Sequence, residues 1–143
     1  RRVLALRVGG NDLMRLLALK RVRGVTSYET PLGLLIQQFV LTFAPFGFHL
    51  TAPVYDFFDD PETLTRETRL DVAMGLVGKT AIHPSQAQVI DKALFPSDEE
   101  MLAARAVLSA GTSAAFGLNG AMLEPAVHSA WASSILSRRS GLD

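Results

Sequence analysis

The stretch of residues 78–86 constrains the fold more than any other part of the sequence. It reads Gly-Lys-Thr-Ala-Ile-His-Pro-Ser-Gln, and residues 77–82 are mostly small or apolar. That composition is typical of a short β-strand covered on both faces. His83 follows at the carboxyl end of this predicted strand. Pro84 suits the first position of a helix, because the N–H that proline lacks would have no intrahelical partner there. In α/β proteins, active sites are usually built at such strand ends.

Two further strand-to-helix passages precede this one. Residues 3–8 and 48–54 are apolar runs of strand length. Thr30-Pro31 opens a predicted helix that stops before Pro45, and Asp60-Pro61 opens another, with the aspartate as the cap. The order strand, helix, strand, helix, strand, helix predicts parallel β/α units.

The polar side chains of this region have expected places as well. The helix after Asp60 is amphipathic, and we expect its charged residues to point outward; these are Glu67, Arg69 and Asp71. His49 lies inside the second predicted strand and is expected to pack there, bonded to a backbone group. Residues 20–30 are polar and predict an exposed loop over the strand ends; its basic residues could meet an anion, but we expect each of them, Arg21 included, to be solvated.

The chain changes character after Pro96. Ser97 and Glu100 have the spacing of a capping box, which predicts a helix start. The sequence then predicts, in order, a long helix, a turn and a final helix: residues 99–115, residues 117–120 and the segment after Pro125. A helical module is therefore expected to follow the β/α units.

Composition excludes several classes of protein. Of 143 residues, 48% are hydrophobic, and 14 basic residues balance 14 acidic ones. The chain is therefore expected to fold, and it offers no net field that would recruit nucleic acid or an anionic membrane. The apolar runs are too short to span a bilayer. Cysteine is absent, which is compatible with a reducing cytosol, and we expect a cytoplasmic protein.

The motif Gly78-Lys79-x-x-Ile82-His83-Pro84-x-Gln86 resembles the signature of the citrate lyase β-subunit-like carbon–carbon lyases. These belong to the aldolase/citrate lyase family of (β/α)8 barrels, and the chain would cover only the C-terminal half of such a protein. The resemblance implies an α/β fold. Residues 1–95 would form about the last three β/α units of a TIM barrel, and residues 96–143 a C-terminal helical module.

Asp12 is the candidate metal ligand. From spacing alone, an aspartate after Gly9-Gly10 is a helix cap or a first-turn residue. However, Gly9-Gly10-Asn11-Asp12-Leu13 is similar to the glycine-x-x-aspartate-leucine stretch of the family, in which the aspartate binds Mg²⁺ at the end of a strand. A carboxylate suits a hard cation. Gly9 and Gly10 would let a substrate approach closely.

Two residues of the opening motif are candidate substrate-binding residues. His83 is either a turn residue whose ring nitrogens bond the backbone or a polar residue close to the substrate, and the resemblance implies the second. Lys79 either extends its ammonium to the end of the barrel or contacts an anion. Gln86 is expected to bond backbone or cofactor.

The sequence departs from the family at two positions. Ala52-Pro53 stands where the family usually has an aspartate, just before Val54-Tyr55. Asp56, Asp59 and Asp60 lie just downstream; Asp60 is assigned to capping, and Asp56 is the candidate substitute for that acid unless this acidic loop is simply solvated. In the C-terminal module, Glu124 stands where the family projects an aspartate into the active site of a neighbouring subunit. We expect Glu124 to be the catalytic acid, although a plain helix-opening role also fits its position.

The resemblance implies a Mg²⁺-dependent carbon–carbon lyase or aldolase. Its substrate would be a small carboxylate or an acyl-CoA thioester, the metal would stabilise the enolate formed on cleavage, and the protein would be a trimer or hexamer of identical chains. The alternative is a non-catalytic assembly module that needs partner chains. Three β/α units cannot close a barrel, so this part of the fold should expose strand edges and apolar faces.

Overall fold

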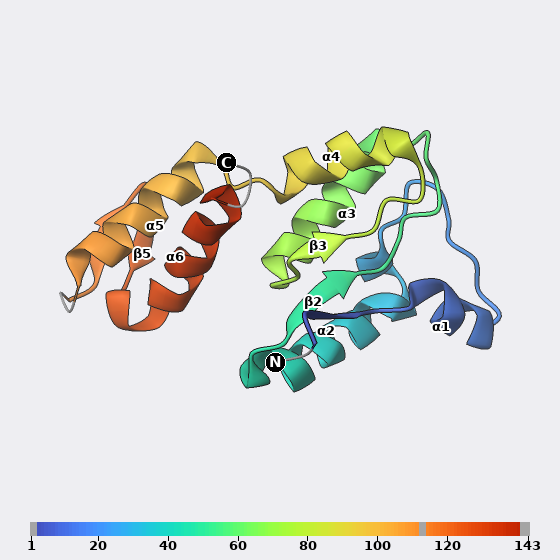
Figure 1. Ribbon diagram of the computed structural model, residues 1–143, viewed down its shortest axis with the longest axis horizontal. Helices are drawn as coiled ribbons and strands as arrows, with labels where there is room; N and C mark the ends of the chain where they lie inside the picture. The colour runs from blue at the N-terminus through green and yellow to red at the C-terminus, as the bar shows by residue number, and fades with distance from the viewer. Residues whose placement is uncertain (1–2, 112–113, 141–143) are drawn as a thin grey trace. The chain divides into compact units, whose positions relative to one another are not determined.

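The computed structural model describes residues 3–111 and 114–140, and the chain divides into two compact units (Figure 1). The first unit extends to Leu94 and the second begins at Phe95. Among the described residues, no helix has the length and apolar character that crossing a membrane requires.

A three-stranded parallel sheet forms the centre of the first unit. Its strands lie in the order β1, β2, β3, with bounds Ala5–Arg7, His49–Ala52 and Gly78–Lys79. Leu6 pairs with Leu50, and Thr51 pairs with Gly78. The helices are α1 (Gly10–Leu16), α2 (Pro31–Phe43), α3 (Pro61–Ala73) and α4 (Pro84–Leu94), with short 3-10 turns at Ser27–Glu29 and Ala44–Phe46. The predicted β/α alternation is confirmed.

The third strand is shorter than predicted. We expected a strand over residues 77–82, whereas β3 pairs with β2 only at Gly78 and Lys79. β2 itself ends at Ala52, the residue paired with Lys79, so the ladder holds only these two positions.

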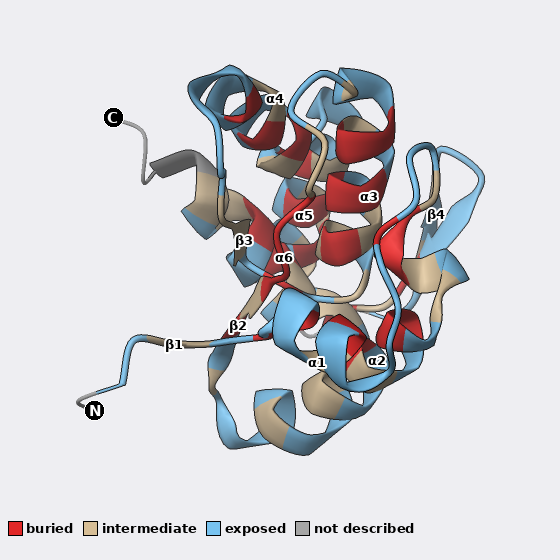
Figure 2. Ribbon diagram, turned by 90° about the vertical axis from the view of Figure 1, so that its right-hand side faces the viewer, coloured by how far each residue is buried: buried red, intermediate tan, exposed pale blue. Residues whose placement is uncertain are grey.

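The helix starts follow the predicted caps. The side chain of Thr30 accepts a hydrogen bond from the N–H of Leu32, and that of Asp60 accepts one from the N–H of Thr63 at 3.1 Å. The core of the sheet region forms where α2 packs on the strands; its fully buried members include Leu32, Ile36, Leu50 and Leu76. Figure 2 shows buried residues recurring along α3, whereas β1 is exposed or intermediate.

The prediction for His49 was wrong. His49 is the first residue of β2 and is exposed. Side chains alternate along a strand, so the buried positions of β2 are Leu50 and Ala52, and the histidine falls on the opposite phase.

The second unit combines two helices with a hairpin. Its elements are α5 (Asp98–Ala110), β4 (Phe116–Leu118), β5 (Ala121–Leu123) and α6 (Pro125–Ser140). The predicted capping box of Ser97 and Glu100 is confirmed. Met101, Val107, Leu123 and Ile135 form part of its core.

Two details of the second unit differ from prediction. The helix expected over residues 99–115 ends at Ala110, because Gly111 takes a φ of 59°, which L side chains rarely adopt. The predicted turn at residues 117–120 is the tip of an antiparallel hairpin. Asn119 and Gly120 both have positive φ, as the two-residue turns of hairpins require.

Candidate functional site

The carboxyl ends of the three strands lead into the loops that carry the predicted site residues. Gly9 and Asp12 follow β1, Asp56 follows β2, and His83 comes shortly after β3. The start of α1 contacts the loop after β2, since Asn11 Nδ2 donates a hydrogen bond to Asp56 Oδ1 at 3.1 Å. The structure therefore brings Asp56 to the first turn of α1, which carries Asp12.

The two adjacent glycines after β1 have different environments. A Cβ on Gly10 would lie 2.6 Å from Cβ of Pro53 and 3.1 Å from Cδ2 of Leu32. Gly10 is buried and allows the start of α1 to pack directly on the end of β2. A Cβ on Gly9 would meet only Asp12 Oδ2, at 3.4 Å. Gly9 is the exposed member of the pair, so the room beside Asp12 is provided by Gly9.

Asp12 is an exposed residue in the first turn of α1. The N-cap position belongs to Gly9, which has no side chain. The described ranges 3–111 and 114–140 contain no group of three or more histidine, aspartate or glutamate side chains placed to hold a metal ion. From the described part of this chain, Asp12 would therefore be a metal ligand without a complete set of neighbours, and its role as a ligand stays a prediction.

His83 joins two loops at the strand ends. Its Nδ1 accepts a hydrogen bond from the N–H of Ser85 at 3.2 Å and lies 2.8 Å from the hydroxyl of that serine. Its ring stacks on Phe58, with 4.8 Å between the ring centroids. The hydroxyl of Ser85 donates to the carbonyl of Phe58 at 3.0 Å. These contacts give His83 a structural role at the junction, while its exposed ring leaves substrate binding as a prediction.

Gln86 bonds the backbone, which confirms one of its two predicted roles. Its amide nitrogen donates to the carbonyl of Tyr55 at 2.9 Å, and its amide oxygen accepts from the N–H of Ile82 at 2.9 Å. The side chain is buried. Gln86 therefore ties the end of β2 to the start of α4.

Lys79 lies inside the unit instead of extending to the end of the barrel. Its Nζ lies 2.7 Å from Glu67 Oε1 and 2.9 Å from Asp71 Oδ2, and all three side chains are 0% exposed. The expectation that Glu67 and Asp71 point outward was wrong. Both lie at helical spacing from Leu64, at i+3 and i+7, on the buried face of α3. That spacing could have placed them, whereas their charge suggested the opposite face.

Arg21 completes the buried charges, so the prediction of a solvated Arg21 was also wrong. Its guanidinium bonds Glu67 and the hydroxyl of Ser27, and its side chain is 2% exposed. The phenol of Tyr28 donates to Asp71 Oδ1 at 2.7 Å. Two cations, Arg21 and Lys79, and two carboxylates, Glu67 and Asp71, are thus buried together, and their formal charges sum to zero.

This arrangement shifts the pKa values of its acids in opposite directions. Burial raises the pKa of Glu67, but the attraction of Lys79 and Arg21 outweighs burial and holds the pKa below its usual range. Burial dominates for Asp71 and raises its pKa, against the attraction of Lys79. Burial, together with the charge of Asp71, raises the pKa of the Tyr28 phenol far above its usual range.

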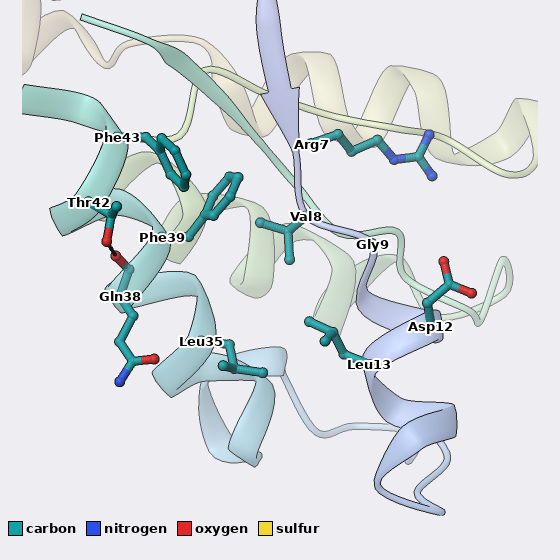
Figure 3. A pocket seen from close by; sticks show the side chains of 10 residues that line it. All are labelled: Arg7, Val8, Gly9, Asp12, Leu13, Leu35, Gln38, Phe39, Thr42 and Phe43. Carbon is teal, nitrogen blue, oxygen red and sulfur yellow. Dashed lines mark hydrogen bonds between the residues drawn. The ribbon is translucent and has the colours of Figure 1, made fainter. Parts of the chain in front are cut away.

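An apolar groove of about 450 Å³ lies between β1, α1 and α2 (Figure 3). Its lining is Arg7, Val8, Gly9, Asp12, Leu13, Leu35, Gln38, Phe39, Thr42 and Phe43. Figure 3 shows Val8, Leu13 and Phe39 grouped together, while the charged ends of Arg7 and Asp12 point away from them. The groove was not predicted. Because its floor is apolar, it suits a hydrophobic element better than a metal or an anion.

Glu124 lies in the second unit, immediately before α6, and is half-buried. Its N–H donates to Nδ1 of His128 at 2.9 Å, and its carbonyl accepts from the N–H groups of Val127 and His128. Glu124 thus takes part in the start of α6 through its backbone. The catalytic role of its carboxylate stays a prediction.

Comparison with known proteins identifies the class. The family of C–C bond lyases of the TIM-barrel fold matches residues 1–141. The chain therefore belongs to this family, as the resemblance of its motif predicted.

Individual relatives agree with this assignment. The chain is 35% identical to the mitochondrial citramalyl-CoA lyase of Homo sapiens over 89 aligned residues. The aligned region is 61% of this chain and 26% of that protein. It is 41% identical over 70 aligned residues to the citrate lyase subunit beta-like protein of Mycobacterium tuberculosis. This aligned region is 48% of this chain and 26% of that protein.

Two solved structures are similar in fold. The first is CitE from Mycobacterium tuberculosis in complex with magnesium, acetoacetate and coenzyme A, with a TM-score of 0.76 and 30% identity over 96% of this chain. The second is a citrate lyase from Burkholderia xenovorans, with a TM-score of 0.74, 20% identity and 99% of this chain covered. The chain spans 52% and 47% of these proteins. It thus has an α/β fold corresponding to part of a TIM barrel.

The two glycines offer a matched pair of substitutions. Gly10→Ala should lower the free energy of unfolding by about 1–3 kcal/mol, because the new methyl group overlaps Pro53. Gly9→Ala should change it by less than about 0.5 kcal/mol, since the surface there is open. Urea unfolding followed by circular dichroism measures both. Equal effects of the two substitutions would contradict the packing role of Gly10.

The lowered pKa of Glu67 predicts a dependence of stability on pH. A carboxyl group with a depressed pKa in the folded state contributes stability above its ordinary pKa of about 4.3, and this stability is lost as pH falls through the folded value. Glu67→Gln should therefore lower the free energy of unfolding at pH 7. The free energy of unfolding should also fall less steeply in this variant than in the wild type when the pH is lowered below about 5. Urea unfolding across this pH range tests the change.

Asp71→Asn should change the pH dependence of stability in the opposite direction to Glu67→Gln. The raised pKa of Asp71 means that its protonation in acid favours the folded state. Removing this carboxyl group should make the acid decline steeper than in the wild type. If the free energy of unfolding of Asp71→Asn fell less steeply in acid than that of the wild type, the opposite pKa shifts of Glu67 and Asp71 would be contradicted.

Proposed function

We propose that this chain is part of a Mg²⁺-dependent carbon–carbon lyase that cleaves an acyl-CoA substrate carrying a carboxylate. The observation that carries the proposal is the position of Asp12, exposed at the carboxyl end of β1 beside the open surface of Gly9. Membership of the C–C bond lyase family supports it. So does the similarity to CitE, whose structure contains magnesium, acetoacetate and coenzyme A.

The residues of this chain fit part of a magnesium site. Asp12 supplies the carboxylate oxygens that Mg²⁺ prefers, on a turn held in place by the contact of Gly10 with Pro53. Asp56, bonded to Asn11, lies on the facing loop. Because the described residues hold no cluster of three ligands, the remaining ligands would come from the other part of a complete barrel. The bound ion would supply Lewis-acid stabilisation of the enolate formed on cleavage.

Of the other predicted site residues, Gly9, His83 and Glu124 would take part directly in this proposal and Lys79 only indirectly. Gly9 leaves space for the substrate, and the exposed ring of His83 lies at the end of β3, where a substrate group could meet it. Lys79 acts only indirectly, since Glu67 and Asp71 already hold its ammonium. Glu124 would move a proton in the site of a neighbouring subunit, in an assembly of three or six identical chains, located in the cytoplasm.

Calorimetric titration with Mg²⁺ tests the proposal on the full product of the gene. Asp12→Asn keeps the shape of the side chain and removes its charge, so Mg²⁺ binding should weaken at least tenfold, equivalent to about 1.4 kcal/mol or more. Asp91→Asn, at an exposed position of α4, is the matched control and should bind as the wild type does. Cleavage of citramalyl-CoA and malyl-CoA should fall in parallel with Mg²⁺ binding. A folded protein that binds no Mg²⁺ would contradict the metal mechanism.

A non-catalytic assembly module is the second candidate, and the groove favours it. Among the described residues β1 pairs only with β2, so its other edge is free to accept a parallel strand. The apolar groove flanks that edge and suits the helix of a preceding β/α unit. In this case the chain would bind the other half of a barrel without contributing to catalysis.

Two adjacent leucines of α2 test this second candidate. Leu35 lines the groove, whereas Leu34 is 61% exposed and does not line it. Sedimentation velocity would measure binding of the chain to the half of the Mycobacterium tuberculosis CitE protein that the chain does not cover. Leu35→Glu should abolish the complex and Leu34→Glu should preserve it, because only the first places a charge in the groove. No complex, or equal loss in both variants, would contradict docking through the groove.

A further inference from the structure

The segment of residues 17–30, which joins α1 to α2, is bound to α3 from the inside of the unit. Arg21 and the N–H of Ser27 both bond Glu67 Oε2, the second at 2.6 Å. The phenol of Tyr28 bonds Asp71 one turn further along α3. Three residues of the segment, Arg21, Ser27 and Tyr28, thus bond two carboxylates of one helix.

Glu67 is the residue on which these contacts converge. Its Oε2 accepts from Arg21 and from Ser27, while its Oε1 accepts from Lys79 of β3 at 2.7 Å. One carboxylate therefore connects the segment, helix α3 and the sheet. Its side chain is 0% exposed, so these bonds are not weakened by solvent.

The outer face of the segment is held by weaker contacts. Arg66 donates to the carbonyl of Gly24 at 2.7 Å, and Arg23 pairs with Asp59 at 3.0 Å. The side chains of Arg23 and Asp59 are 53% and 65% exposed. Exposed ion pairs of this kind contribute little because water and salt screen them. The buried bonds to Glu67 therefore dominate the attachment.

The position of the segment places it beside the candidate site. The guanidinium of Arg21 lies over the ring of Tyr55, 5.2 Å from the centroid, and the N–H of Gly24 bonds Asp60 at 3.3 Å. Tyr55 and Asp60 belong to the loop that leaves the carboxyl end of β2. The segment thus forms a wall next to the strand ends.

We propose that Glu67 is a buried lock that holds residues 17–30 as a wall beside the strand ends, and that this segment opens as one unit when the lock is removed. The sheet does not depend on the lock in the same way, since β1 and β2 are joined by their own ladder and by the core around Leu32 and Leu50. Losing the charge of Glu67 leaves the buried cations of Arg21 and Lys79 with the carboxylate of Asp71, which bonds Lys79, and the segment that carries Arg21 is the part free to move into water. This property of the fold stands whether or not Asp12 binds Mg²⁺.

Amide hydrogen exchange, read by NMR residue by residue, tests the lock. In Glu67→Gln, the amides of residues 20–30 should exchange at least about a hundredfold faster than in the wild type, because one partner of a buried ion pair is lost. The amides of β2 at Leu50 and Ala52 should keep their protection. Arg66→Gln removes only the outer contacts and is the matched control on the same helix, with an expected change below about fivefold.

The outcomes are distinct. Faster exchange confined to residues 20–30 in Glu67→Gln, without it in Arg66→Gln, supports the lock. Unchanged exchange in Glu67→Gln, or equal effects of the two variants, overturns it. If Glu67→Gln unfolds throughout, Arg21→Lys decides, since it keeps the positive charge but shortens the group that bonds Glu67 from the segment. Acceleration restricted to the segment in Arg21→Lys then supports the lock, and its absence overturns it.

Discussion

Within the first unit, one buried carboxylate, that of Glu67, bonds the segment before α2 and strand β3 to helix α3. Burying an ion costs several kcal/mol, and this cost is offset only when partners surround the charge. Here Lys79 comes from β3 and Arg21 from the segment before α2, so the requirement to neutralise Glu67 brings three separate parts of the chain together. The same requirement explains why the lysine of the Gly-Lys motif has little freedom to reach a ligand. Its charge is needed inside the fold.

A second constraint is steric, and it determines how the strand ends meet. Gly10 packs on Pro53, which brings the turn after β1 against the end of β2. β2 ends at Ala52, immediately before Pro53. Ala52-Pro53 is the position where the family usually carries an aspartate. In this chain the proline shapes the surface beside Asp12 and offers no ligand there, while Asp56 is brought near through Asn11.

The sequence predicted what depends on local chemistry. Helix caps at Thr30, Asp60 and Ser97 follow from side chains that bond their own neighbours, and the β/α order follows from apolar periodicity. Family membership followed from the motif of residues 78–86 together with further stretches, among them those around Asp12 and Glu124. The failures concern charges whose partners are distant in sequence. Glu67 and Asp71 were assigned to the surface because the lysine and arginine that neutralise them lie 12 and 46 residues away from Glu67. The hairpin of the second unit is a different failure, since Asn119-Gly120 signals it locally and was taken for a plain turn.

The free edge of β1 connects the fold to the question of activity. A parallel sheet is normally covered on both faces and continued at its edges, and a TIM barrel closes with eight strands. The described sheet has three, and beside β1 lies the apolar groove that we propose as the seat of a further helix. Asp12 lies in the first turn of α1, the helix that follows β1, and among the described residues β1 is paired on one edge only. A strand that paired with β1 in parallel would bring its own carboxyl end beside that of β1, so in the proposed magnesium site it would lie where the missing ligands are needed.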